Sequence, residues 1–165
     1  MEFSLIYLSL GSNLGNRQVN LKKALTELPR KGIDILKNSS IYETEPVEFT
    51  KQPNFLNLVC AAQSTLNPQT ILNVCHQIES GMGRIHIENK GPRCIDIDIL
   101  FYGKVILNLP KLKIPHPALH RRNFVLIPLQ EIASKFRDPL TGKTVKQLAA
   151  ESVDQSKVKK WTLLD

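Results

Sequence analysis

The most informative stretch of the sequence is Cys94-Ile95-Asp96-Ile97-Asp98-Ile99-Leu100. Side chains alternate along a strand, so the three isoleucines share one face and the two aspartates share the other. The Cα atoms of Asp96 and Asp98 are then about 6.6 Å apart. Aspartate is a poor strand former, and like charges at neighbouring positions repel each other. The stretch therefore predicts a strand over 94–102 with one apolar and one acidic face.

Two interpretations of the acidic face are open from spacing alone. Two Mg²⁺ ions about 3.5–4 Å apart, bridged by such carboxylates, would offset the repulsion and clamp transferring phosphates. The alternative is an amphipathic strand with a solvated face. Neighbouring cations favour the metal interpretation, because acids flanked by phosphate-binding cations are typical of a phosphoryl-transfer site. These cations are Arg84, Arg93, Lys111, Lys113, Arg121 and Arg122, and His116 lies among them. Each single arginine could instead be a solvated surface charge, and His116 a packed structural histidine.

Apolar periodicity and turn residues predict the other elements on both sides of this strand. Strands are predicted over 3–10, 33–42 and 55–65, and helices over 17–28, 68–82, 125–133 and 144–150. The polar stretches 44–53 and 84–91 are predicted loops. The order strand, helix, strand, strand, helix, strand favours an α+β sandwich, with a mainly antiparallel sheet and helices on one face. The other face would be free to bind a ligand.

Composition and charge limit the class of protein. The chain has 165 residues, of which 42% are hydrophobic and 22% charged, so we expect a single globular domain over 1–165. The formal net charge of +7 favours an anionic partner such as a nucleotide. The three cysteines form no C-x-x-C pair, and no apolar run reaches membrane-spanning length. We therefore expect a cytoplasmic location.

Other candidate residues each have an ordinary structural alternative. Glu79 and His76 lie three positions apart on one face of a predicted helix, where they either reach a nucleotide or are simply exposed. Phe55 and Phe124 are candidates to stack on a flat heterocycle, although most phenylalanines belong to the core. The glycine-rich stretch 10–17 forms either a phosphate cradle or a tight strand-to-helix turn.

Several motifs together resemble the 6-hydroxymethyl-7,8-dihydropterin pyrophosphokinase family over nearly the whole chain. They are Leu8-Ser9-Leu10-Gly11-Ser12-Asn13, Tyr42-Glu43-Thr44, Phe55-Leu56-Asn57, Gly91-Pro92-Arg93-Cys94-Ile95-Asp96-Ile97-Asp98-Ile99, Ile114-Pro115-His116-Pro117, Arg122-Asn123-Phe124 and Pro128-Leu129. The resemblance implies a ferredoxin-like α+β fold. It also implies ATP-dependent transfer of pyrophosphate to the hydroxymethyl group of the pterin, with release of AMP, in folate synthesis.

The resemblance also implies roles for individual residues. Asp96 and Asp98 match the ligands of two Mg²⁺ ions, and Asp96 also belongs to the pterin site. The other pterin-binding positions match Thr44, Glu45, Val47, Phe55, Asn57 and Phe124. The ATP-binding positions match His76, Glu79, Arg93, Ile99, Lys111, Lys113, His116 and Arg122. The catalytic set is Arg84, Arg93, Asp96 and Asp98, in which Arg84 matches an arginine of a mobile loop.

The sequence departs from the family pattern within the predicted loop 84–91. Well-known members carry a second arginine two residues after the first, where this chain has His86. They often carry tryptophan just before Gly91, where this chain has Lys90, which supplies charge but no indole ring. We expect this departure to affect loop closure and the rate, and not the reaction catalysed.

Two other classes of protein are alternatives from the residues alone. A ferredoxin-like sheet on a basic protein can bind RNA, but the acid pair would repel phosphate without a metal ion. A nuclease or nucleotide hydrolase would use the same two-metal acid pair. The resemblance implies that the protein binds ATP and hydroxymethyl-dihydropterin, and that it binds neither nucleic acid nor a membrane. Other folate-pathway enzymes are then its expected functional neighbours.

Overall fold

The computed structural model describes residues 2–46, 51–83 and 93–162. At its centre, β1 (Ser4–Ser12) lies between β4 (Phe55–Ser64) and β5 (Asp96–Tyr102). The sheet continues from β4 to β3 (Ile41–Thr44) and β8 (Val158–Thr162), and β2 (Asp34–Asn38) also pairs with β4. All of these pairs are antiparallel, which confirms the predicted sheet type.

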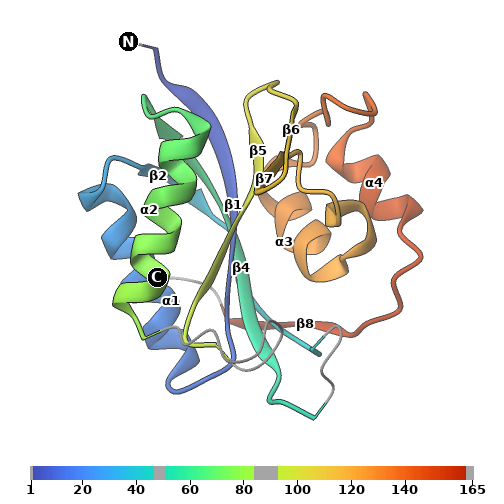
Figure 1. The fold of residues 1–165 in the computed structure, drawn as a ribbon. Coiled ribbons are helices and arrows are strands. Elements are labelled where there is room, and N and C mark those ends of the chain that lie inside the picture. Colours follow the sequence, from blue (N-terminus) through green and yellow to red (C-terminus); the bar gives the residue numbers. More distant parts are fainter. Residues whose placement is uncertain (1, 47–50, 84–92, 163–165) are drawn as a thin grey trace.

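Helices cover both faces of this sheet, so the expectation of helices on one face needs correction. Figure 1 shows α1 (Arg17–Arg30) and α2 (Pro68–Gly81) on one side of the strands, with α3 (Asn123–Ala133) and α4 (Val145–Glu151) on the other. The physical reason is that seven consecutive residues of β1 are buried, so both of its faces need a cover.

Two hydrophobic clusters fill the two layers. Alternate β1 residues such as Leu8 pack under α1 and α2. Tyr7, Val59 and Phe101 pack instead against α3 and α4. The second layer covers only part of its face. Further along the same face, β1 carries Ser9 and Gly11 in place of large apolar side chains, and these two residues line a pocket.

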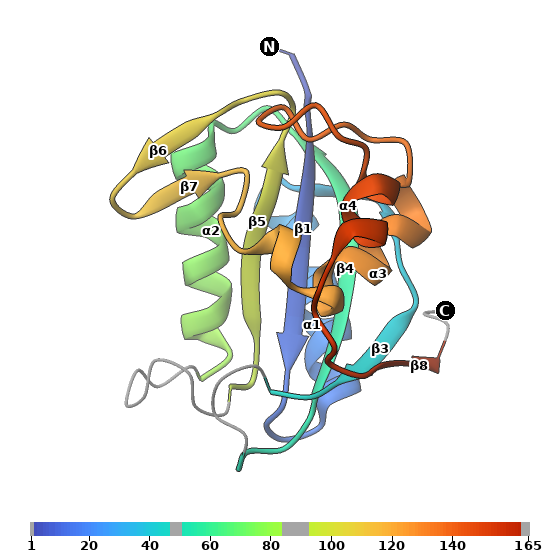
Figure 2. The same ribbon diagram turned by 90° about the vertical axis from the view of Figure 1, so that its right-hand side faces the viewer.

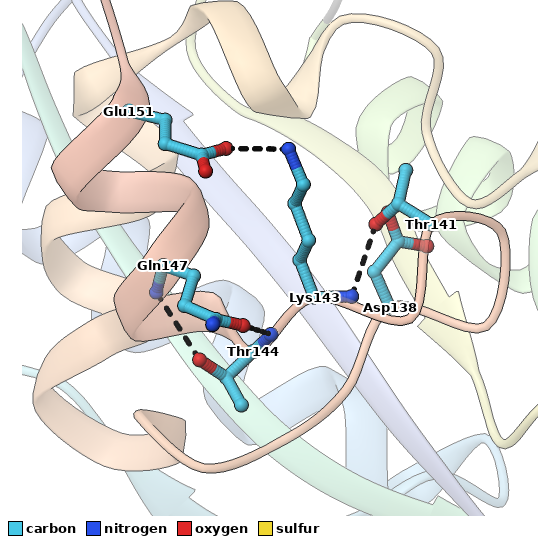
Figure 3. Close-up of polar contacts among 6 residues, drawn as sticks. All are labelled: Asp138, Thr141, Lys143, Thr144, Gln147 and Glu151. Atoms are coloured by element: carbon cyan, nitrogen blue, oxygen red, sulfur yellow. Dashed lines mark hydrogen bonds and ion pairs between the residues drawn. The ribbon is translucent and has the colours of Figure 1, made fainter.

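Local capping explains where the helices begin. The side chain of Asn16 accepts a hydrogen bond from the backbone N–H of Val19 at the start of α1, and Asn67 does the same at α2, where Pro68 follows. At α4, the side chains of Thr144 and Gln147 each bond to the other's backbone N–H (Figure 3).

The predicted strand over 33–42 is wrong as a single element, because it divides into β2 and β3. Between them, Ser39 turns its hydroxyl to the backbone of β4, where it accepts a hydrogen bond from the N–H of Val59 at 2.9 Å. This side-chain contact interrupts the regular backbone ladder. The prediction also missed the hairpin of β6 (Leu107–Leu109) and β7 (Leu112–Ile114), as well as β8.

Cys60, Cys75 and Cys94 are free thiols. Within the described ranges, none of the helices combines the length and the apolar character needed to cross a bilayer.

Candidate active site

The two strand aspartates share one face of the sheet and lie beside the C-terminal half of β1. Asp96 pairs with Gly11, and Asp98 pairs with Ser9. On the far side of β1, Gly11 pairs with Asn57 of β4, so one row of the sheet runs from an aspartate through a glycine to an asparagine. The guanidinium of Arg93 lies 3.0 Å from the Asp96 carboxylate and neutralises part of the charge.

A first pocket lies on this face next to the acids. Its wall includes the aromatic rings of Phe55 and Phe124, the Asn57 amide and residues at the end of β3. Its lining residues are Ser9, Gly11, Thr44, Glu45, Gln52, Phe55, Asn57, Arg93, Asp96, Asp98, Arg122 and Phe124. Two aromatic rings with one oriented amide suit a flat heterocycle that carries hydrogen-bonding edges.

A second, larger pocket lies on the other side of the acids, between α2 and the hairpin of β6 and β7. Its volume is about 480 Å³, against about 110 Å³ for the first pocket. It is lined by Leu72, His76, Glu79, Arg93, Asp96, Ile97, Asp98, Ile99, Pro110, Lys111, Leu112, Lys113, His116, Pro117 and Arg122. Apolar surface beside several cations suits a base and sugar that carry a phosphate chain.

The two pockets meet at shared residues. Arg93, Asp96, Asp98 and Arg122 line both of them. A group bound in one pocket is therefore adjacent to a group bound in the other, with two carboxylates and two guanidinium groups at the junction. This is the arrangement that transfer of an anionic group between two bound molecules requires.

The amide of Asn57 is oriented by a hydrogen bond on one side and faces Gly11 on the other. Its Nδ2 donates to the hydroxyl of Thr44, and Asn57 is almost completely buried. On the opposite side, a Cβ atom added to Gly11 would lie only 2.6 Å from Asn57 Oδ1. The amide oxygen therefore occupies space that any side chain at position 11 would take.

Asn13 connects the two walls of the site. Its Oδ1 accepts a hydrogen bond from the backbone N–H of Arg93 at 2.7 Å. Its Nδ2 donates to the side chain of Gln52 at 2.7 Å and to the carbonyl of Pro53 at 3.0 Å. This buried side chain thus fixes the segment that carries Arg93 against the segment that leads into β4.

A comparison with known families accounts for this geometry. The model of the 7,8-dihydro-6-hydroxymethylpterin-pyrophosphokinase (HPPK) family matches residues 7–134. The chain belongs to this family. The membership confirms the resemblance drawn from the motifs.

Relatives of different lengths share the HPPK region. The pyrophosphokinase of Bacillus subtilis is 35% identical, with 96% of this chain and 90% of that protein covered. The folic acid synthesis protein fol1 of Pneumocystis carinii is 44% identical over 90% of this chain, but the match covers only 20% of that protein. The chain therefore spans about one fifth of the length of this longer relative.

Solved structures confirm the fold. The crystal structure of wild-type Plasmodium falciparum HPPK-DHPS with pteroate superposes with a TM-score of 0.74 at 17% identity, and covers 91% of this chain and 42% of that one. At this identity the likeness concerns the fold alone. It agrees with the α+β, ferredoxin-like class expected of an HPPK chain.

The chemistry of two residues in the larger pocket follows from their surroundings. Glu79 is buried, and its Oε2 accepts a hydrogen bond from the backbone N–H of Ile97 at 2.8 Å, which ties α2 to β5. Burial and the charge of Arg122 lower the pKa of His116 to about 4, against an opposing effect of Asp96. His116 is then neutral at pH 7. Its Nδ1 accepts from the N–H of Ala118, which leaves Nε2–H as a donor.

The structure brings the predicted site residues together in two groups. Every predicted pterin residue that lies within the described ranges lines the first pocket, and every predicted ATP residue lines the second. Arg84 and Val47, like His86 and Lys90, lie outside the described residues. The individual roles remain predictions.

The sequence reading missed some residues that line or support the site. It assigned no part in the site to Ser9 or Gln52, and it considered Gly11 and Asn13 only within the stretch 10–17, as a phosphate cradle or a tight turn. One signal was present, because small residues alternate with Leu8 and Leu10 along β1, and such alternation indicates an open patch on one face. No comparable signal marks Gln52.

Proposed function

We propose that this chain transfers a pyrophosphoryl group from ATP to the hydroxymethyl group of 6-hydroxymethyl-7,8-dihydropterin and releases AMP. The observation that carries the proposal is the junction of the two pockets at Asp96, Asp98, Arg93 and Arg122. Family membership supplies the reaction type, and the junction supplies the place where the two substrates meet.

Asp96 and Asp98 are the residues that fit a metal ion. Both are partly exposed on one face of β5 and line both pockets. No cluster of three or more potential metal-binding side chains occurs in the part of the chain that the structure describes. Mg²⁺ suits such a sparse site, since it commonly uses one or two carboxylates together with waters and substrate phosphates. Two bound Mg²⁺ ions would supply charge neutralisation on the phosphates.

In this proposal, the pterin ring lies between Phe55 and Phe124 in the first pocket. Asn57 reads one polar edge of the ring, because its amide is held between Thr44 and Gly11. The segment at Thr44 and Glu45 contributes a second polar wall. We assign Val47 to the same wall only because its position matches a pterin-binding position of the family.

ATP occupies the second pocket, with its phosphates directed to the junction. The pterin hydroxymethyl oxygen forms a bond to the β-phosphorus, and the bond from that phosphorus to the bridging oxygen of AMP breaks. Arg93, Arg122, Lys111 and Lys113 stabilise the charge of the phosphates, while neutral His116 donates a hydrogen bond. Arg84 is proposed to assist transfer, as its family position suggests.

We also propose that residues 1–165 form one pterin pyrophosphokinase domain that works beside other folate-pathway enzymes. Relatives named as bifunctional folate synthesis proteins in Arabidopsis thaliana support such neighbours. Three free cysteines support a reducing compartment such as the cytoplasm.

Product analysis tests the proposed reaction. The chain is incubated with ATP, Mg²⁺ and the hydroxymethyl-dihydropterin, and nucleotides and pterins are separated by chromatography. We expect AMP and a pyrophosphorylated pterin in equal amounts, and neither product when EDTA removes the metal. Formation of ADP, or hydrolysis of ATP at the same rate without pterin, would contradict the proposal and favour a nucleotide hydrolase.

A further inference from the structure

The segment after α4 bonds to Asn123, next to Phe124, and to Glu45, a residue of the first pocket, although the family model ends before this segment, at residue 134. Figure 2 shows this segment leaving α4, passing the beginning of α3 and reaching β8 beside β3. The beginning of α3 carries Phe124, and the end of β3 carries Thr44. These two residues stand on different walls of the pocket.

The segment holds the first wall through Asp154. The carboxylate of Asp154 accepts a hydrogen bond from the backbone N–H of Asn123 at 2.8 Å, and its backbone carbonyl accepts one from the Asn123 side chain at 2.8 Å. The residue in the N-cap position, Arg122, supplies no side-chain cap to α3. Asp154 therefore serves as the cap from a distant part of the chain and fixes the turn that carries Phe124.

The same segment holds the second wall three residues later. The backbone N–H of Lys157 donates to Glu45 Oε1 at 3.0 Å, and Val158 pairs with Thr44 in the sheet. The hydroxyl of Thr44 in turn accepts the hydrogen bond that orients Asn57. The end of β3, where the pocket begins, is therefore bound to the C-terminal strand.

A third contact reaches the aromatic wall on β4. The ring of Trp161 on β8 lies under the guanidinium of Arg17, which is 5.2 Å from the ring centroid. The same guanidinium bonds to Glu43 at 2.9 Å and to the carbonyl of Asn54 at 3.0 Å, directly before Phe55. Through Arg17, the C-terminal strand supports the segment that positions this phenylalanine.

We infer that residues 154–158 are a strap that sets the width of the pterin pocket, with the Asp154 carboxylate and the backbone N–H of Lys157 as the groups that position the pocket walls for pterin binding. The two anchors are three residues apart, so the chain between them spans at most about 11 Å. A flat ring between two aromatic side chains requires a fixed gap. The strap ties the turn that carries Phe124 to the end of β3, where Thr44 pairs with Phe55. The inference rests on the proposed function, because it assumes that the first pocket receives the pterin.

Two substitutions release the strap at its two anchors. Asp154→Asn keeps the shape of the side chain but removes one carboxylate oxygen that accepts a backbone N–H. Lys157→Pro removes the N–H that donates to Glu45, whereas the control Lys157→Ala keeps it.

A second control is Asp138→Asn, the same chemical change in a turn. Asp138 accepts hydrogen bonds from Leu140 and Thr141, and the close-up in Figure 3 shows it beside Thr141. This turn, between α3 and α4, lies at the opposite end of the molecule from β8 (Figure 2).

Calorimetry then measures the Kd of the pterin in the presence of Mg²⁺ and a non-hydrolysable ATP analogue, and separately the Kd of the analogue. We expect Asp154→Asn and Lys157→Pro each to raise the pterin Kd about tenfold, as loss of one charge-assisted hydrogen bond implies, with the analogue Kd unchanged. The two controls should leave both constants within about twofold of the wild type.

An unchanged pterin Kd in both strap variants would overturn the inference, and so would an equal loss of analogue affinity, which indicates general loosening. Fluorescence of Trp161, the single tryptophan, shows in each variant whether β8 remains docked. Failure of the wild-type protein to bind pterin with the analogue would overturn the proposed function itself. The two failures are therefore distinct.

Discussion

At the scale of single residues, the site depends on the absence of a side chain at Gly11. Its pairing partners are Asp96 on one side and Asn57 on the other, so position 11 lies between the acid proposed to face phosphate and the amide proposed to face the pterin. A Cβ atom there would crowd Asn57 Oδ1 at 2.6 Å and the ring of Phe55 at 3.3 Å. Both groups line the first pocket.

We therefore predict that Gly11→Ala weakens pterin binding and leaves ATP binding almost unchanged. The pterin Kd should rise about tenfold, because the amide must turn away and lose its hydrogen bond with Thr44. Calorimetry with the ATP analogue measures both constants. Gly81→Ala is the matched control, since a Cβ atom there meets nothing within 4 Å. An unaltered pterin Kd in Gly11→Ala would show that Asn57 is not held as described.

The sequence could predict a site residue where a side chain that is unusual for its element, such as an acid in a strand, occurs in a regular pattern. Asp96 and Asp98 alternate with isoleucines, and this pattern identified both the strand and the acid pair. Gly11 and Asn13 could not be assigned a role in this way. Their functions depend on neighbours that are distant in sequence, such as Asn57 across the sheet and Arg93 on another segment.

At the scale of elements, α3 is joined to β3 by one acidic side chain. Glu131 accepts hydrogen bonds from the backbone and the hydroxyl of Ser40, at 3.0 and 2.8 Å, and from the hydroxyl of Tyr42 at 2.7 Å. Burial alone would raise the pKa of Glu131, but the bonds from Tyr42 and Ser40 outweigh it and hold the pKa below its ordinary value. The charged form therefore stabilises the fold.

This arrangement makes the effect of Glu131→Gln depend on pH. At pH 7 we expect the variant to lose about 1 kcal/mol of unfolding free energy, a value reduced for solvent exposure. Because the folded pKa is lowered, the contribution is present above the unfolded value near 4.3 and disappears as the pH falls through the folded value. Urea unfolding at pH 7 and pH 3, followed by Trp161 fluorescence, measures it. A difference that persists at pH 3 would contradict this account.

Glu27→Gln is the control for that experiment. Glu27 forms only a surface pair with Arg30 at 3.4 Å, so its loss should change stability by less than about 0.5 kcal/mol at either pH.

Elements with a clear period were predicted well, and short or interrupted elements were not. The helices α1 and α2 begin at the predicted residues, because a periodic apolar stripe and a capping asparagine mark each of them. By contrast, β8 has the sequence Val-Lys-Lys-Trp-Thr, which shows no clear alternation, and it forms through pairing with β3. For such a segment, pairing with a neighbouring strand determines whether it adopts a strand conformation, and its own sequence pattern does not.

At the scale of the whole molecule, partial coverage of the second face creates the site. Figure 1 shows α3 and α4 packed against one portion of the sheet, while the region with β3 and β8 lies beyond them. The expectation of a completely free face was wrong, because both faces of the central strands are apolar for most of their length. The binding site lies on the portion of this face that α3 and α4 leave uncovered, where Ser9 and Gly11 line the first pocket.

The net charge of +7 leads to a prediction about salt. Raising the ionic strength from about 0.05 to 0.5 M should raise the Kd of the ATP analogue several-fold, because screening weakens attraction between the cationic pocket and the phosphates. The Kd of the uncharged pterin, measured with saturating analogue, should change by less than about twofold. Equal salt dependence for both ligands would contradict the assignment of the two pockets. A salt-sensitive shift of RNA by the protein in a gel-mobility assay would instead support the alternative that the protein binds RNA.

The central claim is that the Asp96 and Asp98 pair holds the metal through which ATP is positioned at the junction of the pockets. The most direct measurement compares wild type with Asp98→Asn in turnover and in Mg²⁺-dependent binding of the ATP analogue. We predict a loss of turnover of at least about a thousandfold and loss of the Mg²⁺-dependent gain in affinity, with an unchanged melting temperature. Near-normal turnover in Asp98→Asn, with Mg²⁺ still strengthening analogue binding, would contradict the account.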